Sequence, residues 1–183
     1  MSELRISGGS LRGRKLEVPG FARPTEGRVR EALFSILGSA VQGARVLDLF
    51  AGSGAVAFEA LSRGASQVDL VDASRATKSL LSRSRDRLGI PEKQAQVHRL
   101  VLPATLPFPP HSFDLVFADP PYEFSLLSRL LAIVTPVIAE SGWFVLEHSS
   151  RIPPPAGQAE LVLLRTRIYG GSALSIYRAD VRA

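Results

Sequence analysis

Hydrophobic residues along the chain occur either in short continuous runs or at intervals of three and four positions. Continuous runs are typical of strands in a parallel sheet, because such strands are covered on both faces. These runs lie at residues 45–49, 68–71, 96–100, 113–118 and 143–147. The wider spacing predicts helices that end near residues 63, 88 and 134. Strands that alternate with helices predict an α/β fold with a mostly parallel sheet between two helical layers.

The two ends of the chain depart from this alternation. Residues 4–7 and 15–18 are strand-like and flank glycines, which predicts a short basic β-hairpin. Residues 160–169 and 174–178 are joined across Gly170-Gly171, which predicts that the sheet finishes in an antiparallel hairpin. We therefore divide the chain into a basic arm, residues 1–25, and one domain, residues 26–183.

The composition excludes several kinds of chemistry. The 183 residues include no cysteine, so disulfides, thiolate catalysis and cysteine-ligated zinc are excluded. The three histidines match no metal-ligand spacing, and we expect no catalytic metal. Charged residues interrupt the start of the sequence, and the longest apolar stretch, 130–139, is too short to span a bilayer. We expect a cytoplasmic protein.

The positive charge is concentrated near the start. The net charge is +5, and the first 45 residues carry eight Lys and Arg against four Asp and Glu. Such an arm could face a polyanion, or it could be an ordinary solvated basic surface.

One candidate ligand site is a glycine-containing loop, residues 50–54, between a predicted strand and a predicted helix. Glycines at 52 and 54 let a ligand approach the backbone, and the helix start offers free N–H groups. The pattern Gly52-x-Gly54-x-x-Ala57, with Asp72 further on, also satisfies the dinucleotide fingerprint. Asp48 favours a different ligand, because its carboxylate would repel a pyrophosphate and attract the ammonium of S-adenosylmethionine (AdoMet). Asp72 would then accept hydrogen bonds from the ribose hydroxyls.

The second candidate is the tetrapeptide Asp119-Pro120-Pro121-Tyr122, which follows the strand predicted at 113–118. Two prolines hold this turn rigid and remove N–H donors. The Asp119 carboxylate and the Pro120 carbonyl could together accept the two N–H groups of an exocyclic amine, while Tyr122 stacks on the attached ring. The alternative is a rigid surface turn with a buried tyrosine.

With these motifs, the chain resembles the bacterial RsmD-type methyltransferases, which modify the guanine N2 of small-subunit ribosomal RNA (rRNA). The matching segments cover nearly the whole chain in order; they include 5–9, 12–16, 23–25, 28–34, 48–54, 59–65, 119–122 and 169–171. The resemblance implies a class I methyltransferase fold with a Rossmann-like, seven-stranded sheet whose last strand is antiparallel, plus a small basic N-terminal extension. It also implies that a flipped guanine of 16S rRNA, in the small subunit or its assembly intermediate, is the substrate.

The candidate residues follow from the motifs and the resemblance together. The catalytic candidates are Asp119, Pro120, Pro121 and Tyr122. The AdoMet-binding candidates are Asp48, Phe50, Ala51, Gly52, Ser53, Gly54, Asp72, Ala73 and Leu100. The RNA-binding candidates, expected to contact phosphates, are Arg12, Arg14, Lys15, Arg23, Arg28 and Arg30. Arg28 or Arg30 could instead support the fold beside Glu31.

The sequence departs from the family pattern at two places near the expected cofactor. Asp72 stands where a glutamate is common, and the segment 98–101 lacks the usual acidic residue near the adenine. Backbone groups near Arg99 or Leu100 are the expected replacement. Three other functions stay open as alternatives: a DNA amino-methyltransferase, an NAD-dependent oxidoreductase, and a non-catalytic RNA-binding assembly factor.

Overall fold

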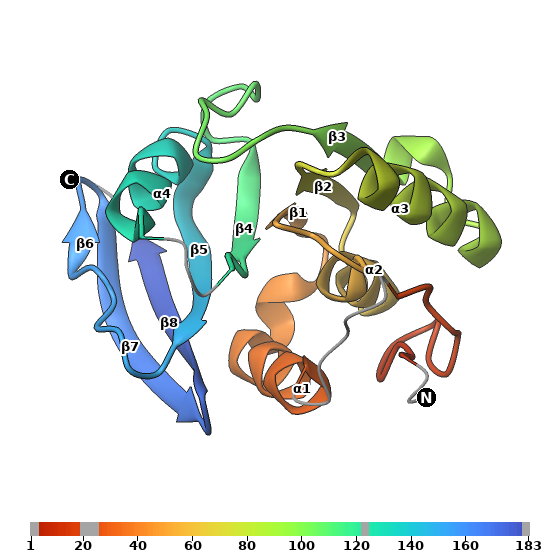
Figure 1. Cartoon of the computed structure of the whole chain (residues 1–183), viewed down its shortest axis with the longest axis horizontal. Helices are drawn as coiled ribbons and strands as arrows, with labels where there is room; N and C mark the ends of the chain where they lie inside the picture. Colours follow the sequence, from red (N-terminus) through yellow and green to blue (C-terminus); the bar gives the residue numbers. More distant parts are fainter. Residues whose placement is uncertain (1–3, 19–25, 122–124, 181–183) are drawn as a thin grey trace. The chain divides into compact units, whose positions relative to one another are not determined.

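The computed structural model describes residues 4–18, 26–121 and 125–180 (Figure 1). The chain divides into two compact units, Met1–Leu100 and Val101–Ala183, which are described one at a time. No helix in these described ranges is long and apolar enough to cross a membrane.

The first unit contains three parallel strands. These are β1 (Arg45–Leu49), β2 (Gln67–Asp72) and β3 (Ala95–Arg99), with β2 in the middle. Val46 pairs with Val68, and Val68 pairs with Ala95. Because the strands are parallel, their carboxyl ends meet at one edge, which is where open α/β sheets bind ligands.

The helices of the first unit agree with the predicted pattern. They are α1 (Glu26–Leu37), α2 (Ala55–Ser62) and α3 (Arg75–Leu88), with short 3-10 turns η1 (Gly38–Val41) and η2 (Glu92–Gln94). The side chain of Ser74 caps α3 by accepting a hydrogen bond from the Thr77 N–H at 3.2 Å. Leu81 and Leu88 of α3 are buried, whereas Ala76 is exposed.

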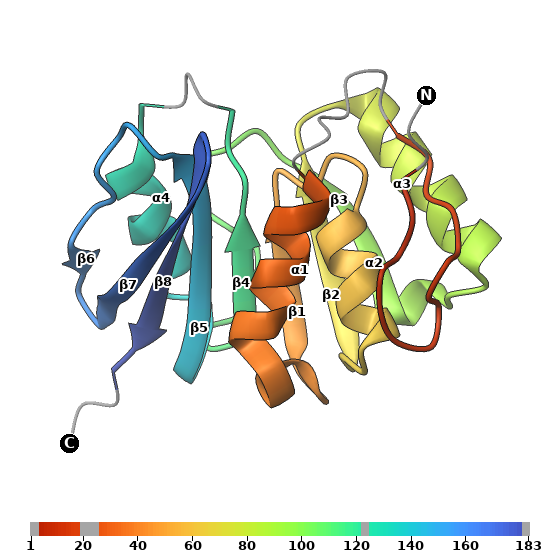
Figure 2. The same ribbon diagram turned by 90° about the horizontal axis from the view of Figure 1, so that it is seen from below.

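The N-terminal segment of this unit forms a hairpin with one antiparallel bridge, Arg5 to Lys15, rather than two full strands. The Leu16 N–H donates to the Leu4 carbonyl at 2.9 Å, and the side chains of Ile6 and Leu16 are buried. Figure 2 shows this hairpin beside α2 and α3. The boundary that we place at residue 25 falls outside the described residues and stays a prediction.

The second unit contains β4 (Phe113–Ala118), α4 (Leu127–Val134), β5 (Ile138–Ser149), β6 (Gly157–Gln158), β7 (Leu161–Tyr169) and β8 (Ser172–Ala179). β4 and β5 are parallel, β8 is antiparallel to β5, and β7 and β8 form the predicted terminal hairpin. The two-residue β6 pairs with the outer side of β7. The expectation of seven strands is therefore one too few for the described residues, because so short a strand leaves no hydrophobic pattern.

Candidate functional site

The loop after β1 has an unusual backbone conformation. Phe50, Gly52 and Gly54 all have positive φ angles, of 61°, 51° and 74°. The turn is closed by the Gly54 N–H, which donates to the Ala51 carbonyl at 2.7 Å. Left-handed backbone at a non-glycine residue such as Phe50 carries strain, which proteins retain most often at functional sites.

The two glycines of this loop serve different purposes. A Cβ at Gly54 would lie 2.6 Å from the Phe58 ring and 2.7 Å from Leu81, so glycine there allows close packing against α2 and α3. A Cβ at Gly52 would meet nothing closer than the Phe50 carbonyl oxygen at 3.8 Å. The backbone at Gly52 therefore faces open space that a ligand can enter.

The ends of β1, β2 and β3 are linked around Asp72. Its carboxylate accepts hydrogen bonds from the Gly52 N–H at 3.1 Å and the Ser74 N–H at 2.9 Å. The Leu100 N–H donates to the Asp72 carbonyl at 3.1 Å. The structure thus brings together the loop, Asp72 and Leu100, three of the places where the sequence analysis expects cofactor contacts. The role of each residue in binding stays a prediction.

Asp48 lies at the base of this loop and is only 2% exposed. Its carboxylate accepts a hydrogen bond from the Ala57 N–H at 3.2 Å, and no ion pair to it is found within the described part of the chain. Burial, with a smaller contribution from the charge of Asp72, raises the pKa of Asp48 to about 7, although the Ala57 hydrogen bond acts in the opposite direction. A positively charged ligand group beside Asp48 would stabilise its ionised form.

The second motif lies in the second unit, at the carboxyl end of β4. Asp119 is exposed, Pro120 is buried and Pro121 is exposed. The buried ring of Pro120 restricts the backbone of the turn, and the preceding Asp119 is accessible from solvent. Tyr122 lies outside the described residues, and its expected stacking role stays a prediction.

The RNA-binding candidates fall into three groups. Arg12, Arg14 and Lys15 are exposed on the hairpin, and Arg28 is exposed on α1. Arg23 lies outside the described residues. Arg30 is only 6% exposed, so the expectation that it contacts RNA phosphates is wrong for this structure.

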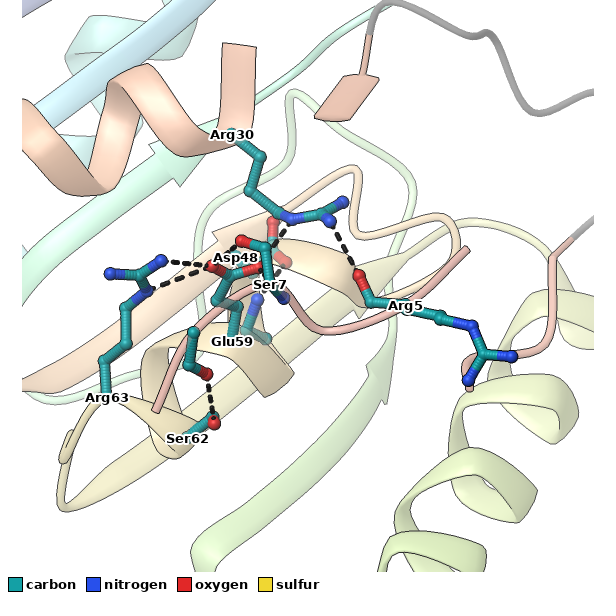
Figure 3. A network of polar contacts seen from close by, with 9 residues as sticks. Arg5, Ser7, Arg30, Asp48, Glu59, Ser62 and Arg63 are labelled. Atoms are coloured by element: carbon teal, nitrogen blue, oxygen red, sulfur yellow. Dashed lines mark hydrogen bonds and ion pairs between the residues drawn. The ribbon is translucent and has the colours of Figure 1, made fainter. Parts of the chain in front are cut away.

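Arg30 takes part in a buried polar network centred on Glu59 of α2 (Figure 3). Glu59 is fully buried and pairs with the Arg30 Nε at 2.7 Å and the Arg63 Nη2 at 2.7 Å. The hydroxyl and the N–H of Ser7 also donate to Glu59, and the Arg30 Nη2 donates to the Arg5 carbonyl at 2.8 Å. Arg30 thus supports the fold, but through Glu59 rather than the neighbouring Glu31.

The network determines the charge of Glu59. Burial by itself would raise the pKa of Glu59, but the hydrogen bonds from Ser7 and Arg63 and the charge of Arg30 outweigh it, and the pKa is lower than usual. Glu59 is therefore ionised at neutral pH and attaches the hairpin to α2.

Residues 4–178 match a protein family described as Conserved hypothetical protein 95. The chain belongs to this family. It is 33% identical to the ribosomal RNA small subunit methyltransferase D of Escherichia coli K12, and the match covers 98% of this chain and 92% of that protein. It is 36% identical to the protein of the same name from Haemophilus influenzae, over 77% of this chain and 73% of that one.

Solved structures agree with this assignment. The E. coli methyltransferase structure named for yhhF superposes with a TM-score of 0.88 and 33% identity, covering 99% of this chain and 100% of that one. A SAM-dependent methyltransferase from Aquifex aeolicus has a TM-score of 0.64 at 17% identity, which shows a shared fold alone. The predicted α/β methyltransferase fold, the RsmD-type family and the class of enzyme, an rRNA methyltransferase, are thereby confirmed.

The Glu59 network is the part of this family member that sequence reasoning missed. Two signs of it are present in the sequence: a glutamate in the mostly apolar helix of residues 55–62, and Arg63 four positions later. Ser7 and Arg30 could not be added to them, because they meet Glu59 only in the folded chain.

Proposed function

We propose that the chain transfers a methyl group from AdoMet to the exocyclic N2 amine of a flipped guanine in the 16S RNA of the small ribosomal subunit. The observation that carries this proposal is Asp48, a buried carboxylate with a raised pKa beneath an open glycine loop, in a member of a methyltransferase family. Relatives named small subunit methyltransferase D support ribosomal RNA as the substrate.

The residues around the loop fit AdoMet better than a dinucleotide. The carboxylate of Asp48 suits the ammonium of a methionine moiety and would repel a pyrophosphate. Asp72 already accepts two backbone N–H groups, and its remaining lone pairs can accept ribose hydroxyls. The open space at Gly52 leaves room for the ligand beside the backbone. Ala73 and the backbone near Leu100 are the proposed adenine contacts.

Bound AdoMet would supply an electrophilic methyl group. In our proposal Asp119 and the Pro120 carbonyl accept the two N–H groups of the guanine amine, and Tyr122 stacks on the base. These acceptors hold the nitrogen in line with the methyl carbon and stabilise the positive charge that develops on nitrogen as the new C–N bond forms. Transfer would break the bond between the methyl carbon and the AdoMet sulfur, and the sulfur would keep the electron pair as a neutral thioether. The nitrogen would lose its extra proton to solvent water without a separate strong base, and its lone pair would again be delocalised into the ring.

The exposed cations of the hairpin, Arg12, Arg14 and Lys15, are the proposed contacts to RNA phosphates. A hairpin of this size offers charge without a recognition helix, so selectivity must come from the shape of the substrate. We propose that the substrate is rRNA already folded with ribosomal proteins, in the cytoplasm, where an exposed loop makes base flipping less costly.

The proposal is tested by incubating the protein with labelled AdoMet and small-subunit rRNA, either protein-free or in assembled particles at matched salt, and analysing the nucleosides. We expect label in N2-methylguanosine, with faster transfer to particles. Label in another nucleoside, or in DNA rather than RNA, would contradict the proposed target. Equal or faster methylation of the same guanine in protein-free RNA would contradict the assembled substrate.

The role of Asp119 is tested in the same assay. Asp119→Ala should lower turnover at least a hundredfold, because losing one preorganised hydrogen-bond partner costs about 3 kcal/mol in the transition state. Its AdoMet affinity should stay near that of the wild type. Glu140→Ala, which removes another exposed carboxylate of the second unit, is the matched control and should stay active. More than a tenth of wild-type turnover in Asp119→Ala would disprove the role.

A further inference from the structure

A shallow groove on the surface of the first unit is lined only by cationic and hydroxyl side chains. Its lining residues are Arg75, Lys78, Ser79, Ser82, Arg83 and Arg99. All but Arg99 belong to α3, and Arg99 is the last residue of β3. The groove lies outside the set of residues that the proposed function uses.

The groove follows one face of α3. Its five helical residues lie at positions i, i+3, i+4, i+7 and i+8, which share a face of an α-helix. The opposite face packs inward through Leu81 and Leu88. From Arg75 to Arg83 the helix rises about 12 Å, a distance over which one strand of a duplex places roughly three to four phosphates.

Charge in the groove is mostly uncompensated. No carboxylate is among its lining residues, and within the described part of the chain neither Arg75 nor Lys78 forms an ion pair. Arg83 pairs with Glu17 of the N-terminal segment at 3.1 Å. Arg99 donates to the Ala73 carbonyl at 3.1 Å. The groove thus has three exposed cations on one face of α3 and a fourth, Arg99, at the end of β3.

The groove is joined to the hairpin that carries the other exposed cations. Glu17 also pairs with Arg87 at 2.6 Å, and the Arg14 Nη2 donates to the Arg87 carbonyl at 2.9 Å. These contacts hold the hairpin against α3 in one unit (Figure 2). The cations of the hairpin and those of the groove are therefore carried by two segments in direct contact, with Glu17 at the junction.

We infer that the α3 groove is a second phosphate-binding surface, which holds the backbone of the substrate RNA next to the hairpin. The inference rests on the proposed function for the identity of the polyanion. Guanidinium, ammonium and hydroxyl groups are the donors that bind RNA phosphates. A lipid surface fits less well, because a membrane-binding face also presents apolar side chains and this groove has none.

The test compares two double variants that remove the same charge. Arg75→Ala with Lys78→Ala empties part of the groove, and Arg165→Ala with Arg167→Ala removes two exposed arginines from β7. Affinity for a labelled oligouridine of about twenty nucleotides is measured across a salt series, and AdoMet affinity by calorimetry. Circular dichroism checks folding, and Arg75→Gln with Lys78→Gln replaces the groove variant if the alanine form is unfolded.

We expect the groove variant to bind oligouridine roughly tenfold more weakly, with a salt slope shallower by about 1.4, since each phosphate contact on single strands contributes about 0.7. The β7 variant should bind as the wild type does, and AdoMet affinity should be unchanged in both. Wild-type affinity in the groove variant, or an equal loss in both variants, would overturn the inference. So would a loss of binding to phosphatidylglycerol vesicles with RNA binding unchanged.

Methylation of small-subunit rRNA by the wild type separates the two proposals. If the wild type methylates rRNA while the groove variant binds RNA normally, only the groove inference fails. If the groove variant alone loses RNA binding while the wild type methylates no RNA, only the proposed function fails.

Discussion

Glu59 and Asp48 are both buried carboxylates of the first unit, yet their surroundings are opposite. Glu59 receives two arginines and two donors from Ser7, and the pKa of its carboxyl is lowered. Asp48 receives one backbone N–H, from Ala57, and its pKa is raised to about 7. The chain itself compensates the buried charge of Glu59, whereas it leaves that of Asp48 largely uncompensated.

The difference agrees with a structural role for Glu59 and with the proposed ligand-binding role for Asp48. Burying a charge is costly unless it is paired and hydrogen-bonded. At Glu59 the partners come from the hairpin, α1 and α2, so the charge holds three segments together. At Asp48 the described part of the chain supplies no cation, and the ammonium of the proposed cofactor would fit there.

The largest effect is expected on breaking the Glu59 network. Glu59→Ala leaves the buried guanidinium of Arg30 without its carboxylate, and should lower the free energy of unfolding by about 3 to 5 kcal/mol in urea titrations. Glu140→Ala is the control at an exposed carboxylate and should change it by less than about 0.5 kcal/mol. A loss near that of the control would mean that the network does not stabilise the fold.

Because of this network, deleting the N-terminal segment would be a poor test of RNA binding. Removing residues 1–20 would take away Ser7 and the buried side chains of Ile6 and Leu16 together with the exposed cations. Such a deletion would weaken the fold as well as RNA binding. Substitutions at Arg12, Arg14 and Lys15 remove charge without removing buried contacts.

The pH dependence of stability that Asp48 causes should be opposite to that expected from a carboxylate with a lowered pKa, such as Glu59. A carboxyl whose pKa is raised on folding binds more protons in the folded state, so stability falls as pH rises from about 4 to about 7. The difference between 3.8 and about 7 corresponds to roughly 4 kcal/mol. Asp48→Asn should remove this loss, so the variant should unfold at a higher urea concentration than the wild type at pH 8. Equal pH profiles of the two proteins in urea would show that Asp48 is compensated in some other way.

The elements that have a regular hydrophobic pattern could be predicted from the sequence. The strands at 45–49 and 113–118 have the predicted bounds, because continuous apolar runs between turns leave little choice of element. The glycine loop and Asp72 could be expected at one sheet edge, since parallel strands place their carboxyl ends together.

What could not be predicted depends on contacts between distant segments. Arg30 borders the apolar stripe of α1, and periodicity alone could not decide whether it is exposed. Its burial depends on Glu59, which is 29 positions away in the chain. The α3 groove depends likewise on Arg99, which the fold places beside a helix that ends at Leu88.

The pH dependence of AdoMet affinity should test the role proposed for Asp48 in contrast to Glu59. If the ammonium pairs with ionised Asp48, then affinity measured by calorimetry should rise about fivefold from pH 6 to pH 7, and about tenfold in all by pH 8. Asp48→Asn should bind about tenfold more weakly at pH 8 and lose the dependence near pH 7. Unchanged affinity in this variant would reopen the dinucleotide interpretation.

The smallest expected effect isolates one hydrogen bond of the Glu59 network. Ser7→Ala removes the hydroxyl donor to Glu59 but keeps the backbone N–H that donates to it at 3.2 Å, so unfolding should become easier by about 1 kcal/mol. Glu59 has a lowered pKa, so its stabilising contribution is present above about pH 4.5 and is lost as pH falls below that value. Without the hydroxyl the pKa of Glu59 should rise, and acid unfolding should begin at a higher pH. Ser10→Ala is the matched control, because the Ser10 hydroxyl donates to the Ser62 carbonyl at 3.3 Å and not to Glu59. If both variants shifted acid unfolding equally, the shift would reflect a general loosening of the hairpin rather than the charge of Glu59.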